Sequence, residues 1–97
     1  MRRHDMPKVV ITAQVEDLVK WENGFRTHGN LFKSQTVTKP IDFATTAGNQ
    51  VAICAEPDDL ATFMKIMDSP AVAEAMANDG VRRETVRMFV LDKEMKV

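Results

Sequence analysis

Apolar and polar positions divide the chain into short strand-like runs and longer segments with a period near 3.6 residues. Residues 8–15 (KVVITAQV) form a β-branched, mostly apolar run and predict a first strand. The runs 41–46 and 50–56 flank the turn sequence 47–49 (Ala-Gly-Asn) and predict an antiparallel hairpin. Residues 83–92 (RETVRMFVLD) predict a fourth and final strand.

Two helical regions separate these strands. The first is predicted from about 18 to 33, because its apolar stripe recurs at spacings of three and four residues. The stripe consists of Leu18, Trp21, Phe25, His28 and Phe32. The second region begins after residues 57–59 (Pro-Asp-Asp) and restarts at residues 69–70 (Ser-Pro). It ends before Gly80, which can adopt the left-handed conformation.

The resulting order, β-α-β-β-α-β, predicts an α+β ferredoxin-like fold with an antiparallel sheet and helices on one face. The last strand carries apolar residues on both faces, with Val86, Met88 and Val90 on one, and Phe89 and Leu91 beside Arg87 on the other. A sheet face that meets water should instead alternate apolar and polar residues. We therefore expect a second copy of the chain to cover the face without helices, which makes the protein a homodimer.

Composition limits the broad class of protein. The 97 residues, 44% of them apolar, suit a single domain over 1–97, with residues 1–6 as a loose tail. The net charge of -1 excludes a general nucleic-acid binder, which needs a basic excess to neutralise phosphates. The longest apolar run, 9–13, is too short to span a membrane, and we expect a soluble, cytoplasmic protein. A lone cysteine, Cys54, excludes an internal disulfide and is expected to be a buried, inert thiol.

Three segments resemble the dimeric α+β-barrel superfamily, and within it the small proteins related to antibiotic-biosynthesis monooxygenases. The first is VEDLVKWENGFRTH (15–28), which opens on Glu16, Asp17 and Trp21. The second segment is residues 69–76. The third is the end of the second helical region, residues 78–81 (Asn-Asp-Gly-Val). The resemblance covers residues 8–92. It implies that two chains form a dimeric barrel, with a pocket between the sheet and the helices of each subunit.

The resemblance is specific for the fold and much less specific for the reaction. The superfamily contains cofactor-independent oxygenases, haem-degrading enzymes, cyclases and isomerases. Haem-degrading relatives carry a tryptophan and a histidine on the later helical region, whereas residues 58–78 contain neither. The quinone-forming monooxygenases of the family rely on a tryptophan that stands on a different element from Trp21. The resemblance therefore assigns no catalytic residue to this chain. We expect no cofactor, and two histidines with scattered carboxylates predict no metal site.

His28 is the best candidate for a catalytic residue, because it places an imidazole on an apolar stripe. Three roles remain open: a core histidine bonded to a backbone carbonyl or water, a polar anchor for a ligand, or a general base. Gly29 follows it and removes side-chain volume beside the stripe. A pocket between the first helix and the sheet is expected there, bordered by His28 and Gly29.

The ligand expected in this pocket is an apolar or amphipathic small molecule, fatty-acid-like or polyketide-like. Aromatic side chains and flexible methionines would line it. The candidate ligand-binding residues are Trp21, Phe25, His28, Gly29, Phe32, Met64, Met67 and Met88. Two alternatives remain open: a cofactor-independent monooxygenase or isomerase of the antibiotic-biosynthesis type, and a structural dimer without a ligand.

Overall fold

The computed structural model describes residues 7–97, so the tail predicted at 1–6 lies outside the described residues. Four strands and four helices follow one another along the chain. In order they are β1 (Lys8–Val15), α1 (Leu18–Phe25), α2 (Gly29–Ser34), β2 (Asp42–Thr46), β3 (Gln50–Ala55), α3 (Leu60–Met67), α4 (Pro70–Asn78) and β4 (Val81–Leu91).

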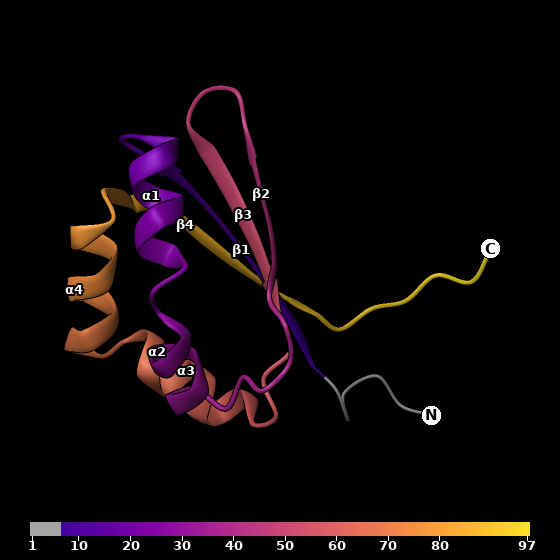
Figure 1. The fold of residues 1–97 in the computed structure, drawn as a ribbon. Coiled ribbons are helices and arrows are strands. Elements are labelled where there is room, and N and C mark those ends of the chain that lie inside the picture. Colours follow the sequence, from indigo (N-terminus) through magenta and orange to yellow (C-terminus); the bar gives the residue numbers. More distant parts are fainter. Residues whose placement is uncertain (1–6) are drawn as a thin grey trace.

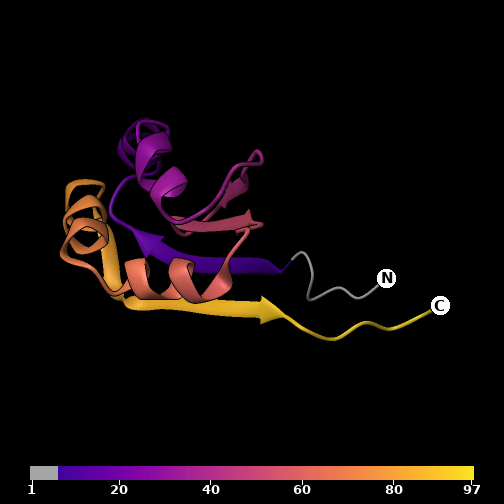
Figure 2. The ribbon, with the colours of Figure 1, turned by 90° about the horizontal axis from the view of Figure 1, so that it is seen from below.

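The four strands form one sheet in the order β2-β3-β1-β4, and every neighbouring pair is antiparallel. The helices lie on one side of this sheet, and the other side is open (Figures 1 and 2). The predicted α+β ferredoxin-like arrangement is therefore confirmed. Beyond the end of β4, the C-terminal residues extend away from the sheet (Figure 1).

The side of the sheet that faces the helices carries two clusters of buried apolar residues. One gathers around Phe63, which is fully buried against Val9 and Ile11. The other gathers around Trp21 and Val51. Alternation along each strand sends every second side chain to this side of the sheet.

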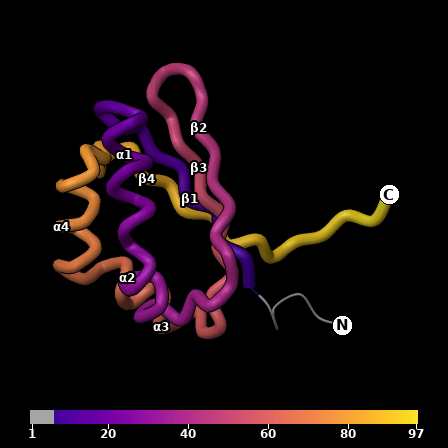
Figure 3. The backbone as a smooth tube through the Cα atoms, viewed as in Figure 1, coloured from indigo at the N-terminus to yellow at the C-terminus, as the bar shows by residue number. Residues whose placement is uncertain are grey.

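The first helical region is not one helix, and the prediction of a continuous helix over 18–33 is wrong. Helix α1 ends at Phe25 and α2 begins at Gly29, and the path of the backbone between them can be followed in Figure 3. At the break, the amides of Thr27 and His28 bond carbonyls three residues back, and the Thr27 hydroxyl also donates to the carbonyl of Gly24. These short-range bonds tighten the last turn and end α1.

The remaining helix ends follow the sequence signals. Asp17, Asp59 and Ser69 cap α1, α3 and α4 with side-chain oxygens that accept backbone N–H bonds. Hydrogen bonds from the hydroxyl and amide of Thr62 hold the pKa of Asp59 below its ordinary value. The predicted restart at 69–70 is confirmed. Gly80 has φ +75° and ends the helical region as expected.

The open side of the sheet is apolar near β4, as the sequence predicted. Phe89 pairs with Val10 and remains 54% exposed, and Leu91 is 40% exposed. Cys54 on β3 pairs with Val10 from the opposite side of β1. Its side chain is half-buried, whereas the sequence predicted a buried thiol. An exposed apolar stripe of this kind crosses the strands β3, β1 and β4.

We predict that Phe63→Ala lowers the free energy of unfolding by about 3–5 kcal/mol, because Phe63 is fully buried and the truncation leaves a cavity. Val19→Ala is the control, since Val19 is 71% exposed, and it should change stability by less than about 0.5 kcal/mol. Urea titration of both variants measures the difference. Equal losses in the two variants would contradict the core described above.

Candidate functional site

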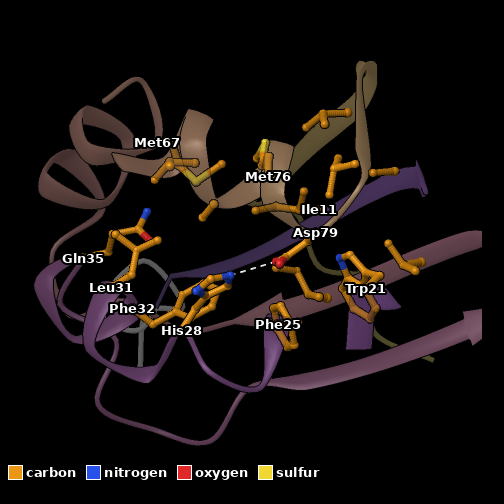
Figure 4. A pocket seen from close by; sticks show the side chains of 17 residues that line it. Ile11, Trp21, Phe25, His28, Leu31, Phe32, Gln35, Met67, Met76 and Asp79 are labelled. Atoms are coloured by element: carbon orange, nitrogen blue, oxygen red, sulfur yellow. Dashed lines mark hydrogen bonds and ion pairs between the residues drawn. The ribbon is translucent and has the colours of Figure 1, made fainter. Parts of the chain in front are cut away.

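A small cavity lies between the helices and the sheet, where the two apolar clusters meet. Its volume is about 80 Å³, and its walls are mostly apolar. Figure 4 shows the side chains that line it. They are Ile11, Ala13, Trp21, Phe25, His28, Leu31, Phe32, Gln35, Val51, Ile53, Met67, Val72, Ala75, Met76, Asp79, Val81 and Val86.

His28 and Asp79 point toward one another across the wall of this cavity (Figure 4). The distance from His28 Nε2 to Asp79 Oδ2 is 2.8 Å, and the Asp79 side chain is only 9% exposed. An ionised carboxylate is an acceptor only, so Nε2 donates and carries a proton. In a neutral ring this leaves the lone pair on Nδ1, which has no partner among residues 7–97.

The break between α1 and α2 places the imidazole. His28 precedes α2 at its N-terminus, but its side chain makes no capping bond there. It reaches instead to Asp79, the residue that ends α4. One hydrogen bond therefore joins two turns that are 51 residues apart in the chain.

Gly24 makes room for the carboxylate. A Cβ atom added at Gly24 would lie 2.0 Å from Asp79 Oδ1 and 2.7 Å from its carboxyl carbon. Real Cβ atoms do not approach so closely, so a larger residue at position 24 would displace Asp79. The glycine in α1 costs up to about 1 kcal/mol of helix propensity, and the close approach explains why it stands there.

Two further polar groups at the cavity are buried and lack a full set of partners. The Trp21 side chain is buried, and its indole N–H has no acceptor within the described part of the chain. Gln35 is 1% exposed; its amide nitrogen donates to the carbonyl of Phe63, while its amide oxygen has no donor among residues 7–97. Buried polar groups are ordinarily satisfied, so both can offer hydrogen bonds to a molecule in the cavity.

The structure brings together five of the eight predicted ligand-binding residues. Trp21, Phe25, His28, Phe32 and Met67 line the cavity. The other three lie elsewhere. Met64 is 38% exposed on α3, and Met88 packs into the core cluster around Phe63 without lining the cavity. Gly29 is exposed at the start of α2 and has no neighbour within 4 Å of an added Cβ, so it does not open the cavity as expected.

The sequence indicated His28 but not Asp79, the residue to which its side chain is hydrogen-bonded. Asp79 stands beside the helix-ending Gly80, where an aspartate is usually an exposed, helix-stopping residue. Gln35 follows the apolar stripe at the end of α2 and carries no signal of burial. Gly24 was the one local hint, because an unexplained glycine inside a helix indicates that another group approaches closely.

Within residues 7–97, no group of three or more histidine, cysteine, aspartate or glutamate side chains could hold a metal ion. None of the described helices is both long and apolar enough to cross a bilayer.

No family model matches the chain. No curated protein matches it either. Solved structures match it well in fold. A protein from Bordetella bronchiseptica, provisionally named an antibiotic biosynthesis monooxygenase, superposes with a TM-score of 0.74 at 12% identity, over 94% of this chain and 99% of that one.

Two more neighbours carry related names. SnoaB, a cofactor-independent oxygenase from Streptomyces nogalater, has a TM-score of 0.69 at 14% identity, over 96% of this chain and 97% of its own. A protein from Nitrosomonas europaea, also provisionally named an antibiotic biosynthesis monooxygenase, has a TM-score of 0.67 at 8% identity, over 92% and 90%. The chain thus has the fold of antibiotic biosynthesis monooxygenase-like proteins, as the sequence resemblance implied.

Two glycine substitutions test the packing around Asp79. Gly24→Ala should lower the free energy of unfolding by about 1–3 kcal/mol, because the new methyl group overlaps the Asp79 carboxylate. Gly29→Ala is the matched control. Nothing lies near its added methyl group, so this change should be neutral or stabilise the protein by up to about 1 kcal/mol. Urea titration separates the two, and a Gly24→Ala variant as stable as Gly29→Ala would refute the close approach.

Proposed function

We propose that the protein is a cofactor-independent enzyme that binds a small apolar or amphipathic molecule in the cavity and transfers a proton between that molecule and His28. The observation that carries this proposal is the 2.8 Å contact between His28 Nε2 and the buried carboxylate of Asp79 at an otherwise apolar wall. Of the three roles open to His28, bonding to a backbone carbonyl does not match this contact. A positioned base matches it best.

The pair has the arrangement that general-base catalysis needs. The carboxylate holds the ring in one orientation and one tautomer, and it stabilises the imidazolium ion that forms when Nδ1 takes a proton. Asp79 is therefore a positioning residue, and His28 is the group that meets the substrate. The apolar walls exclude water, which strengthens the electrostatic interaction between the two side chains.

Oxygenase chemistry follows from such a base if the substrate carries an acidic O–H or C–H group. Transfer of that proton to His28 leaves an electron-rich enolate or phenolate, which can give electrons to dioxygen directly. One oxygen atom then enters the substrate, replacing two hydrogens, and the other leaves as water. The fold shared with SnoaB, a cofactor-independent oxygenase, supports this class, while an isomerase would use the same first step.

The free N–H of Trp21 and the free amide oxygen of Gln35 would orient the substrate. One offers a donor and the other an acceptor, and both line the cavity. A molecule with a carbonyl or hydroxyl group on an apolar ring fits these partners. A sugar or a nucleotide would need many more hydrogen bonds than these walls provide.

Elimination of 5-nitrobenzisoxazole tests the base directly, because a base removes one C–H proton, the N–O bond breaks and a coloured nitrophenolate forms. We predict that the protein accelerates this reaction and that His28→Gln lowers the rate by about 100-fold or more. Asp79→Asn should also lower the rate, because it weakens the hydrogen bond that orients the His28 ring. Absorbance of the phenolate at saturating substrate gives the rates.

His4→Gln is the matched control, because it removes the only other histidine of the chain. It should leave the rate unchanged. If both His28→Gln and His4→Gln keep the elimination rate of the parent protein, His28 is not the base. The binding-only alternative predicts that the compound binds without any acceleration.

We also propose that two copies pack through their open sheet faces. The apolar stripe formed by Val10, Phe89 and Leu91 supports this assembly. Exposed apolar patches on a sheet normally mark a surface that binds another protein. The interface should bury at least about 1,000 Å² in total.

Sedimentation velocity at micromolar concentration should show a dimer for the unmodified protein. Phe89→Asp should shift it to a monomer, because a charge would be buried without a partner. Val19→Asp is the control on the helical side, where Val19 is exposed, and should remain a dimer. A monomeric parent protein would rule out this mode of assembly.

A further inference from the structure

A second hollow lies outside the cavity, between the α1–α2 region and the segment that leads into β2. This groove has a volume of about 460 Å³ and is separate from the cavity that holds His28 and Asp79. Its residues are Phe25, Arg26, Gly29, Phe32, Lys33, Val37, Thr38, Lys39, Pro40, Ile41 and Phe43. Gly29, which the sequence analysis placed at the inner pocket, belongs to this groove.

The charged residues of the groove all have the same sign. Arg26, Lys33 and Lys39 line it, and no carboxylate does. Two of these cations are already paired with carboxylates outside the groove, Arg26 with Glu22 at 2.7 Å and Lys39 with Glu56 at 3.4 Å. Lys33 has no ion pair within the described part of the chain. The groove therefore has a cation available for an anionic group.

The floor of the groove is apolar and aromatic. Phe25 and Phe32 meet edge to face, with ring centroids 5.6 Å apart, and Phe43 meets Phe25 at 5.1 Å. Val37 and Ile41 continue this surface. A cationic rim over an aromatic floor matches a molecule with one negative charge on an apolar ring or chain.

Phe25 and Phe32 form the wall between the groove and the cavity, because each of them lines both. The cavity alone, at about 80 Å³, is smaller than the roughly 300–1,000 Å³ of pockets that hold drug-sized ligands. The groove alone falls within that range. A ligand of this size must therefore lie largely in the groove, and its end enters the cavity only when the two rings move apart.

We propose that the groove binds the anionic, apolar part of the substrate, and that this substrate is an organic monoanion such as an aromatic carboxylate. The proposal rests on the proposed function in one respect, that the chemistry takes place at His28. Lys33 and Arg26 recognise the negative group, and the aromatic floor carries the ring or chain. The reactive end reaches the cavity when the contact between the rings of Phe25 and Phe32 opens.

Two fluorescent probes of nearly the same shape test this charge requirement. 8-Anilinonaphthalene-1-sulfonate carries one negative charge, and N-phenyl-1-naphthylamine lacks the sulfonate and is neutral. Lys33→Glu should raise the Kd of the anionic probe by about three- to tenfold and leave that of the neutral probe unchanged. Lys65→Glu is the matched control, because Lys65 is also an exposed lysine in the last turn of its helix, and it should change neither Kd.

A variant with the opposite effect strengthens the test. Arg26 donates to Glu22 Oε2 at 2.7 and 2.9 Å, which partly neutralises its charge. Glu22→Gln should release the guanidinium and lower the Kd of the anionic probe. Equal effects of Lys33→Glu and Lys65→Glu on the anionic probe, or no effect of either, would overturn the proposal.

Amide NMR shifts locate the bound probe. The anionic probe should shift the signals of Gly29 and Thr38 in the groove. Shifts confined to Val10 and Phe89 would place it on the open sheet face and overturn the proposal. Probe affinity and the elimination rate at His28 are measured separately, so failure of the groove proposal leaves the proposed base intact, and the reverse also holds.

Discussion

Burial of the Asp79 carboxylate is the constraint on which the site depends. A buried acceptor left without a donor costs about 1–3 kcal/mol, and more when it is charged. His28 Nε2 supplies the donor, and Gly24 supplies the space. The helical region that would otherwise run through His28 is broken at 26–28, which turns the ring toward α4. The interaction thus joins the break between α1 and α2 to the end of α4, and it places a titratable ring at an apolar wall.

The cavity follows from the same arrangement. It lies where the two apolar clusters meet, and the aromatic rings of Phe25 and Phe32 separate it from the outer groove. Trp21 stacks on Phe25 with ring centroids 4.8 Å apart, which fixes the wall on one side. A rigid wall with few polar groups suits a base that must meet its substrate in a dry environment. The cationic residues Arg26, Lys33 and Lys39 line the groove and not the cavity, so they do not compete with His28 for the Asp79 carboxylate.

Much of the fold could be predicted from the sequence, because strand alternation and helix caps act over short distances. The stripe through His28 and Phe32 correctly indicated the side that faces the sheet, yet it could not show the break after Phe25. Periodicity reports which residues face the core, whereas the end of α1 depends on local hydrogen bonds. Asp79 could not be paired with His28, since nothing near either residue indicates the other. Gly29 was predicted to border the pocket because it follows His28, whereas Gly24 is the glycine that Asp79 approaches. A sequence shows where a glycine is, but not which group lies opposite it.

The nitrogen shifts of the His28 ring test the central claim most directly. Long-range proton–nitrogen correlation of the neutral ring should show one fixed tautomer, with the proton on Nε2 and a bare lone pair on Nδ1. The same spectrum of Asp79→Asn should lose this preference, because the acceptor that holds the Nε2 proton is weakened. A proton on Nδ1 in the parent protein, or an Nε2 signal that Asp79→Asn leaves unchanged, would contradict the account.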